Sequence, residues 1–251
     1  MKKALFGERK WETVFLLIEE AAIAGMIVYY LFFGNRPEHA LKFFITMFLV
    51  MIPLILGLLL SARTLLPIYC FAAVYASGHT VASCFGFYLS CPWWDKGMHF
   101  VEGFLFTMVA YYVLQKLCKG TGGRRAANLV AAVSFSVLIA VLWEVAEFTA
   151  DRFFVLDMQK DSYVTYIDSY LLGGNSGEIE TIPKIESVTV NGKELPGYID
   201  VGLTDTMYDL ITSLGGSLLF LLYAIFDRDR HPLIRFLKGS ETEEKGFDGE
   251  A

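Results

Sequence analysis

Long apolar runs separated by short polar turns dominate the pattern of this chain. A helix needs roughly 20 apolar residues to cross the hydrocarbon core of a bilayer. Lipid offers the backbone no water to bond, so apolar runs of about that length are predicted to be helices. The expected segments are Val14–Phe33, Phe43–Leu60, Leu65–Leu89, Phe100–Leu117, Ala126–Ala150 and Tyr208–Phe226. The pattern therefore predicts an all-α transmembrane helical bundle of about six helices.

One long polar stretch, residues 152–204, interrupts this pattern before the last segment. Within it, "SVTVNGKEL" alternates β-forming and polar residues around Asn191-Gly192, a pair typical of a type I′ turn. We predict a small β-hairpin in an extracytoplasmic insertion, although a plain solvated loop is also compatible with the sequence. The polar tail, residues 239–251, is predicted to be disordered. Residues 1–251 are treated as a single membrane domain.

Composition agrees with a membrane protein. The chain is 55% hydrophobic and 19% charged, whereas soluble domains carry about a quarter charged residues. The net charge of −6 arises in the loops, and no basic patch indicates nucleic-acid binding. Membrane lipids are the expected partners, and the sequence does not indicate an oligomeric state.

The distribution of basic residues predicts the orientation. The predicted topology places both termini on the same side of the membrane. Fourteen Lys and Arg residues fall on that side, and seven fall on the opposite side. Cytoplasmic loops carry the excess of basic residues. Both termini are therefore expected in the cytoplasm, in a multi-pass protein of the cell (inner or plasma) membrane. The first apolar run is too long for a signal-peptide core and is expected to be retained.

Three predicted helices carry ionisable residues near their outer ends, at spacings that place them on one helix face. These are Asp95, His99 and Glu102; Glu144, Glu147 and Asp151; and Asp205 and Asp209. Ionisable residues at membrane depth usually face the bundle interior and mark function. A purely structural role stays open, because aspartates also cap helix N-termini.

Carboxylates together with histidines favour a divalent metal ion. The expected ligands are His79, His99, Glu144, Glu147, Asp205 and Asp209. His99, Glu147 and Asp95 are the candidate catalytic residues, and Lys96 and Arg152 are the candidates for holding an anionic substrate group. These residue types do not fix the identity of the metal. For Cys84 and Cys91, both a disulfide in an oxidising compartment and ordinary apolar packing stay open.

Four short motifs follow one another along the chain. They are "SGH" (77–79), "DKGMHFVEGF" (95–104), "LWEVAEF" (142–148) and "DTMYDL" (205–210). In this order they resemble the YjdF-like family of bacterial inner-membrane proteins, whose pattern is a Gly-His, then D-[RK]-x-x-H-F-x-x-G, then E-x-x-E, then D-x-x-x-D. A more distant similarity links the "DKGMH" motif to VanZ-like membrane proteins. The resemblance implies a helical membrane fold and these site residues, and it assigns no reaction.

Three functional hypotheses follow. In the first, a bound metal activates water in a membrane hydrolase or transferase that acts on a lipid-linked substrate. In the second, the carboxylates bind protons or cations in a transporter, although the sequence contains no inverted repeat. In the third, the polar cluster only holds the helices together.

Overall fold

The computed structural model describes residues 10–59, 66–117, 125–154, 157–174 and 177–227. All six predicted apolar segments are helical within these residues. The helices are α2 (Lys10–Phe32), α3 (Pro37–Leu59), α4 (Leu66–Phe85), α5 (Phe87–Ser90), α6 (Pro92–Leu117), α7 (Arg125–Phe154) and α8 (Leu203–Asp227). The predicted all-α bundle is therefore confirmed. The tail that we predicted to be disordered lies outside the described residues.

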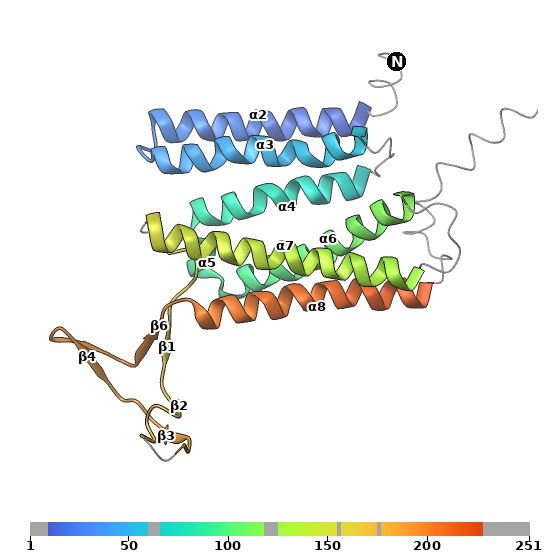
Figure 1. The fold of residues 1–251 in the computed structure, drawn as a ribbon. Coiled ribbons are helices and arrows are strands. Elements are labelled where there is room, and N and C mark those ends of the chain that lie inside the picture. The colour runs from blue at the N-terminus through green and yellow to red at the C-terminus, as the bar shows by residue number, and fades with distance from the viewer. Residues whose placement is uncertain (1–9, 60–65, 118–124, 155–156, 175–176, 228–251) are drawn as a thin grey trace, which may run out of the picture.

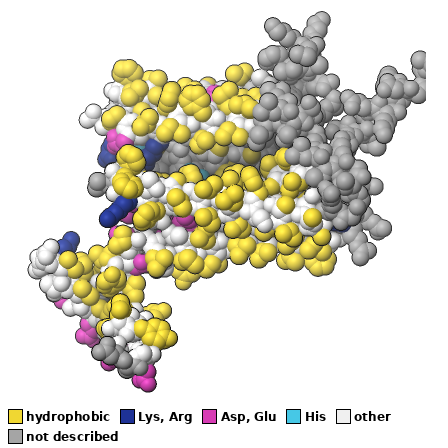
Figure 2. Space-filling view, in the orientation of Figure 1, with side chains coloured by type: hydrophobic (Ala, Val, Ile, Leu, Met, Phe, Trp, Pro, Cys, Tyr) yellow, Lys and Arg dark blue, Asp and Glu magenta, His cyan; other side chains and the backbone are white. Residues whose placement is uncertain are grey.

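Four helices of the described chain are long and apolar enough to cross a membrane. They are α2, α6, α7 and α8. Helices α3 and α4 run alongside them, and successive long helices point in opposite directions (Figure 1). On the face that Figure 2 shows, apolar side chains cover the flank of the bundle, and the charged side chains of the described residues gather mostly toward the end that bears the β-strands. This distribution suits helices whose flanks face lipid.

The long helices form two groups with separate hydrophobic cores. The first group, α2–α4, packs around residues such as Tyr30, Phe43 and Val50. The second group, α6–α8, packs around residues such as Tyr111 and Phe220. Figure 1 shows the two groups as an upper and a lower layer. The acidic residues of α6, α7 and α8 therefore lie within one three-helix unit.

Helices α6 and α8 approach each other closely because glycines line their contact. A Cβ atom at Gly103 would overlap the backbone of Ser213, and one at Gly216 would overlap the backbone carbonyl of Phe100. Small residues let helix backbones come together in this way in membranes. Ser217 completes the contact, since its hydroxyl donates to the carbonyl of Gly103. The contact brings the acidic faces of α6 and α8 together.

Several helix boundaries differ from the prediction, and two of these differences bear on the site. The expected segment Leu65–Leu89 is divided between α4 and α5 at Gly86, whose φ of 72° is left-handed. Helix α6 begins at Pro92 rather than at Phe100, since proline is favoured in the first turn and "WWDKGMH" continues the helix. His99 and the neighbouring Asp95 therefore lie in the opening turns of α6.

The insertion between α7 and α8 contains three antiparallel strand pairs. Strands β4 (Val188–Val190) and β5 (Lys193–Leu195) form the predicted hairpin. Its turn residues Asn191 and Gly192 both have positive φ, as a type I′ turn requires. The prediction missed the other two pairs, because their strands lie apart in the sequence and no two-residue turn joins them. They are β1 (Ser162–Val164) with β6 (Tyr198–Asp200), and β2 (Ile167–Ser169) with β3 (Glu180–Ile182).

Candidate functional site

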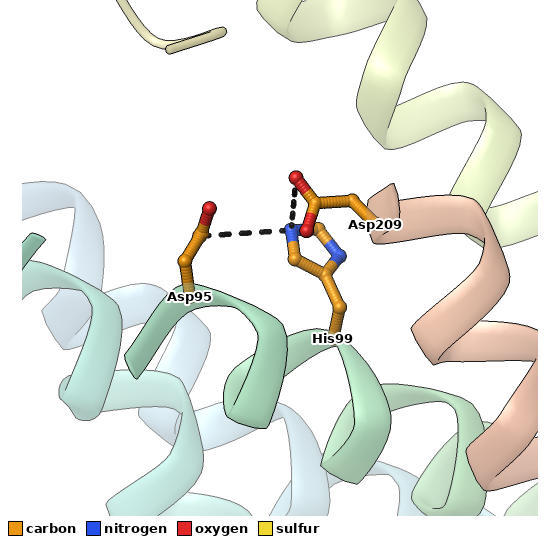
Figure 3. A group of neighbouring side chains, drawn as sticks. All are labelled: Asp95, His99 and Asp209. Atoms are coloured by element: carbon orange, nitrogen blue, oxygen red, sulfur yellow. Dashed lines mark ion pairs between the residues drawn. The ribbon is translucent and has the colours of Figure 1, made fainter. Parts of the chain in front are cut away.

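Asp95, His99 and Asp209 converge at the end of the bundle that bears the insertion. One ligand atom of each residue lies within 4.8 Å of the others, and all three side chains are buried. His99 Nε2 lies 3.8 Å from Asp95 Oδ1 and 3.8 Å from Asp209 Oδ2. Figure 3 shows the imidazole, from α6, pointing between the two carboxylates. We call these three residues the central group.

The other nitrogen of His99 faces a third carboxylate. His99 Nδ1 lies 3.2 Å from Glu102 Oε2, one turn further along α6. His99 is only 1% exposed, and Glu102 is also buried. A carboxylate behind an imidazole fixes the orientation and the tautomer of the ring. The i, i+3 spacing on α6 places Glu102 beside His99 Nδ1, although this nitrogen has no hydrogen-bond partner in the described chain.

Lys96 joins α6 to α8 through two aspartates. Its ammonium group donates to Asp205 Oδ1 at 2.5 Å and to Asp209 Oδ1 at 2.7 Å. Its distance to Asp95 Oδ2 is longer, 3.6 Å. The second oxygen of Asp209 has no hydrogen-bond partner in the described chain, although Asp209 is 1% exposed. Buried polar atoms usually have a partner, so this oxygen is open to a water molecule, a proton or a ligand.

A segment of the insertion, residues 157–161, covers the central group from outside. The Lys160 ammonium group donates to Asp95 Oδ2 at 2.9 Å, and the Lys160 backbone N–H donates to Asp205 Oδ2 at 2.9 Å. Gln159 is buried and its side-chain amide donates to the hydroxyl of Thr206. We call residues 157–161 the covering segment.

Asp151 attaches the covering segment to the end of α7. Its carboxylate accepts from the backbone N–H groups of Met158 and Gln159, at 2.7 and 2.8 Å. Partial burial, together with the negative charges of Asp161, Asp151 and Asp205, raises the pKa of Asp157. Asp151 therefore holds the backbone of the covering segment and is not part of the central group.

His79 lies beside the central group but contacts tyrosines. Its Nδ1 is 2.6 Å from the hydroxyl of Tyr88, and its Nε2 is 3.3 Å from the hydroxyl of Tyr75. The ring centroids of His79 and His99 are 6.5 Å apart. His79 therefore borders the site from α4, with both nitrogens already engaged.

The expected residues of α7 divide between two environments. Glu144 and Glu147 are buried, and one oxygen of Glu144 has no hydrogen-bond partner among the described residues. Arg152 is exposed at the end of α7 and lies outside the described ion pairs of the cluster. The structure thus brings Asp95, His99 and Asp209 together, surrounds them with Lys96, Asp205 and Glu102, and leaves Arg152 apart.

Sequence reasoning missed Lys160 and Tyr88. Lys160 lies in a loop more than 40 residues from α8, and Tyr88 lies in an apolar run. The Lys160 ammonium group lies 5.0 Å from the centroid of the Tyr88 ring. The one sequence signal for Lys160 is its place soon after the end of α7, which keeps it near the helix ends that bear the insertion.

The fold and the site define a helical membrane protein with a buried cluster of aspartates and a histidine. The family described as "Predicted membrane protein (DUF2238)" matches residues 15–230. The chain belongs to this family of uncharacterised membrane proteins, and the resemblance drawn from the four motifs is thereby confirmed.

A similar protein of Thermotoga maritima is described only as an uncharacterised protein. It is 37% identical over 75 residues, a match that covers 30% of this chain and 38% of that protein. The matched part thus spans well under half of the relative. No solved structure matches the chain significantly.

Proposed function

We propose that the central group binds a divalent metal ion and that the protein is a metal-dependent membrane hydrolase or transferase acting on a lipid-linked substrate. One observation carries the proposal: His99 Nε2 faces Asp95 Oδ1 and Asp209 Oδ2 at equal distances of 3.8 Å. Ligand atoms that share a tetrahedral ion at about 2.1 Å lie roughly 3.4 Å apart. A small inward movement of the three side chains would therefore suffice to coordinate an ion.

The surroundings of the central group also suit a metal. Glu102 Oε2 lies 3.2 Å from the far nitrogen of His99, the position that carboxylates take behind metal-bound imidazoles, although the described chain makes no hydrogen bond to that nitrogen. Asp209 Oδ2 is buried and has no hydrogen-bond partner in the described chain. One histidine with two carboxylates is a donor set compatible with Zn²⁺ or Mn²⁺.

Glu144 and Glu147 are the candidates for a further metal ligand and for the general base. Both are buried on the face of α7 that packs against α6 and α8, and Glu144 has an unpartnered oxygen in the described structure. We assign Glu147 as the general base for water and Glu144 as a further ligand. A metal would lower the pKa of its bound water and polarise a phosphoryl or ester group of the substrate.

The sequence predicted that Lys96 holds an anionic substrate group, but in this proposal it first neutralises two aspartates. Its ammonium group contacts Asp205 and Asp209 rather than an open surface. It therefore neutralises and positions these carboxylates while no ion is bound. A divalent ion on Asp209 would take over part of that neutralisation and leave the ammonium group available to an anionic substrate group.

A second candidate function is proton- or cation-coupled transport. The polar residues continue inward from the cluster, where the buried hydroxyls of Thr107 and Ser213 have no partner in the described chain. Ser136 and Ser217 lie in the same seam between helices, hydrogen-bonded at 3.1 Å. An enzyme site confined to the outer end does not need this seam, whereas a path for protons would use it.

Metal analysis of the purified protein tests the first proposal. We expect detergent-purified wild type to hold about one equivalent of a divalent metal, and His99→Ala and Asp209→Asn to lose it. Asp168→Asn is the matched control, because Asp168 lies exposed in the insertion and contacts Thr181. Equal metal content in all four proteins would overturn the metal site. Metal-independent proton uptake in proteoliposomes would favour the transporter.

A further inference from the structure

Lys160 occupies a small binding environment of its own at the edge of the site. Its ammonium group donates to Asp95 Oδ2 at 2.9 Å and lies 5.0 Å from the centroid of the Tyr88 ring. A carboxylate combined with an aromatic face is an arrangement that binds ammonium groups. The hydrogen bond between the Tyr88 hydroxyl and His79 holds this ring in place.

This environment adjoins the metal position proposed above and shares Asp95 with it. Asp95 uses its Oδ2 oxygen for Lys160, while its Oδ1 oxygen faces His99. One carboxylate can therefore serve a metal ion and an ammonium group at the same time. The Lys160 side chain is 32% exposed, so this position lies at the edge of the bundle rather than in its core.

The covering segment does not depend on the Lys160 side chain. The backbone N–H of Lys160 is held by Asp205, and the side chain of Gln159 is held by Thr206. Asp151 accepts from two further backbone N–H groups of the segment. The side chain of Lys160 can therefore leave Asp95 while the backbone of the segment stays in place.

We infer that Asp95 and the Tyr88 ring form a binding subsite for a primary ammonium group, which the side chain of Lys160 fills in this structure. This inference rests on the proposed function, because it names the substrate class of that site: a lipid with an aminoethyl headgroup. The hydrogen bond to Asp95 requires an N–H donor. A trimethylammonium group has none and is the natural negative probe.

The position of the subsite fits a headgroup of the bilayer. It lies at the start of α6, next to Trp93, which is 80% exposed, and Trp94. Tryptophans concentrate at the level of lipid headgroups. An aminoethyl headgroup at this level would meet Asp95 and Tyr88 while its acyl chains stay in the bilayer.

Chemical rescue of Lys160→Ala tests the subsite. The full-length protein is purified in detergent without metal, and its thermal unfolding midpoint is measured with ethylammonium chloride or, at equal concentration, choline chloride. We expect Lys160→Ala to lower the midpoint by a few degrees and ethylammonium to restore it, because a ligand of the native state stabilises it. Choline should have no effect. In wild type the Lys160 side chain fills the subsite, so a shift of the unfolding midpoint should need at least about tenfold more ethylammonium.

Further variants locate the binding. Asp95→Asn added to Lys160→Ala should abolish the rescue, and Tyr88→Leu should weaken it several-fold. Lys184→Ala is the control, since this exposed lysine pairs with Glu186 in the insertion. Lys160→Gln repeats the experiment if the alanine variant does not fold. Equal responses to ethylammonium and choline, or rescue that survives Asp95→Asn, would overturn the subsite.

Nanodiscs identify the source of the ammonium group. A higher midpoint of Lys160→Ala in phosphatidylethanolamine than in phosphatidylcholine would support a lipid headgroup. Rescue by ethylammonium without a lipid difference would keep the subsite and overturn its assignment to a lipid. The rescue is measured on metal-free protein, so it does not depend on the proposed metal. If rescue is missing while the separate metal analysis still finds metal bound to wild type, the subsite is refuted and the metal site stands.

Discussion

At the scale of single residues, the site balances buried carboxylates against ammonium groups. Lys96 contacts Asp205 and Asp209, and Lys160 contacts Asp95. A buried charge without a partner destabilises the folded protein. Each lysine therefore stabilises the fold by neutralising the aspartates that it contacts. His99 differs from both lysines, because its Nε2 faces two carboxylates at 3.8 Å without a short hydrogen bond.

Replacing His99 with Gln should remove metal while leaving the protein inserted in the membrane. Gln lacks the imidazole nitrogen that faces Asp95 and Asp209, and metal affinity should fall by more than about 100-fold. Glu102→Gln acts only through the orientation of His99 and should cost about 10–100-fold. Isothermal titration with Mn²⁺ and Zn²⁺ measures both. Unchanged affinity in His99→Gln would show that the histidine is structural.

Replacing Lys96 with Ala should destabilise the metal-free protein. The change leaves Asp205 and Asp209 buried without their counter-ion, which costs about 3–5 kcal/mol for a buried pair. Asp209→Asn in the same chain should recover part of that loss, because it removes one of the two unpaired buried carboxylates. Unfolding in mild detergent gives the four free energies of this double-mutant cycle. Additive losses would mean that the two residues do not interact.

At the scale of elements, the contact between α6 and α8 positions the central group. Asp95 and His99 come from α6 and Asp209 from α8, so their separation depends on how closely these helices approach. Gly103 and Gly216 permit that approach, since neither site has room for a Cβ atom. The site is therefore coupled to packing one or two turns below it.

Gly103→Ala should disturb the site from a distance. The added methyl group would overlap the backbone of Ser213 and force α6 and α8 apart, at a cost of about 1–3 kcal/mol or more. Metal affinity should fall in the same variant. Gly97→Ala is the matched control on α6, because nothing lies within 4 Å of a Cβ atom there. Thermal unfolding and metal titration of both variants check this, and equal behaviour would contradict it.

At the scale of the whole molecule, the helices form two groups that each have a core, and the site belongs to one of them. The α2–α4 group reaches the site mainly through His79, whose ring lies 5.9 Å from that of Trp143 on α7. The insertion emerges at the same end and supplies the covering segment (Figure 1). Three parts of the chain therefore meet at one end of the molecule.

Labelling with a membrane-impermeant thiol reagent should place that end outside the cytoplasm. In a chain whose native cysteines are replaced by serine, Thr189→Cys in β4 should react in intact cells. Thr121→Cys, between α6 and α7, should react only after the membrane is opened. The excess of basic residues at the end with both termini is the physical reason. The reverse pattern would place the site on the cytoplasmic side.

The sequence by itself determined the helices, the hairpin at Asn191-Gly192 and most residues of the cluster. Apolar runs of bilayer length admit little besides helices, and helical spacing places Asp95, His99 and Glu102 on one face. A type I′ turn requires positive φ at two residues, which Asn-Gly supplies. These features are local, so a short stretch of sequence contains their cause.

Only the tertiary structure decided which of these residues meet. Spacing along one helix cannot reveal that Asp209 joins Asp95 and His99 while Arg152 stays exposed, because that depends on helix rotation and on the Gly103–Ser213 contact. Lys160 is the clearest case. Its contact with Asp95 spans 65 residues of chain, and it exists because the covering segment folds back over the helix ends, which hydrophobic periodicity does not encode.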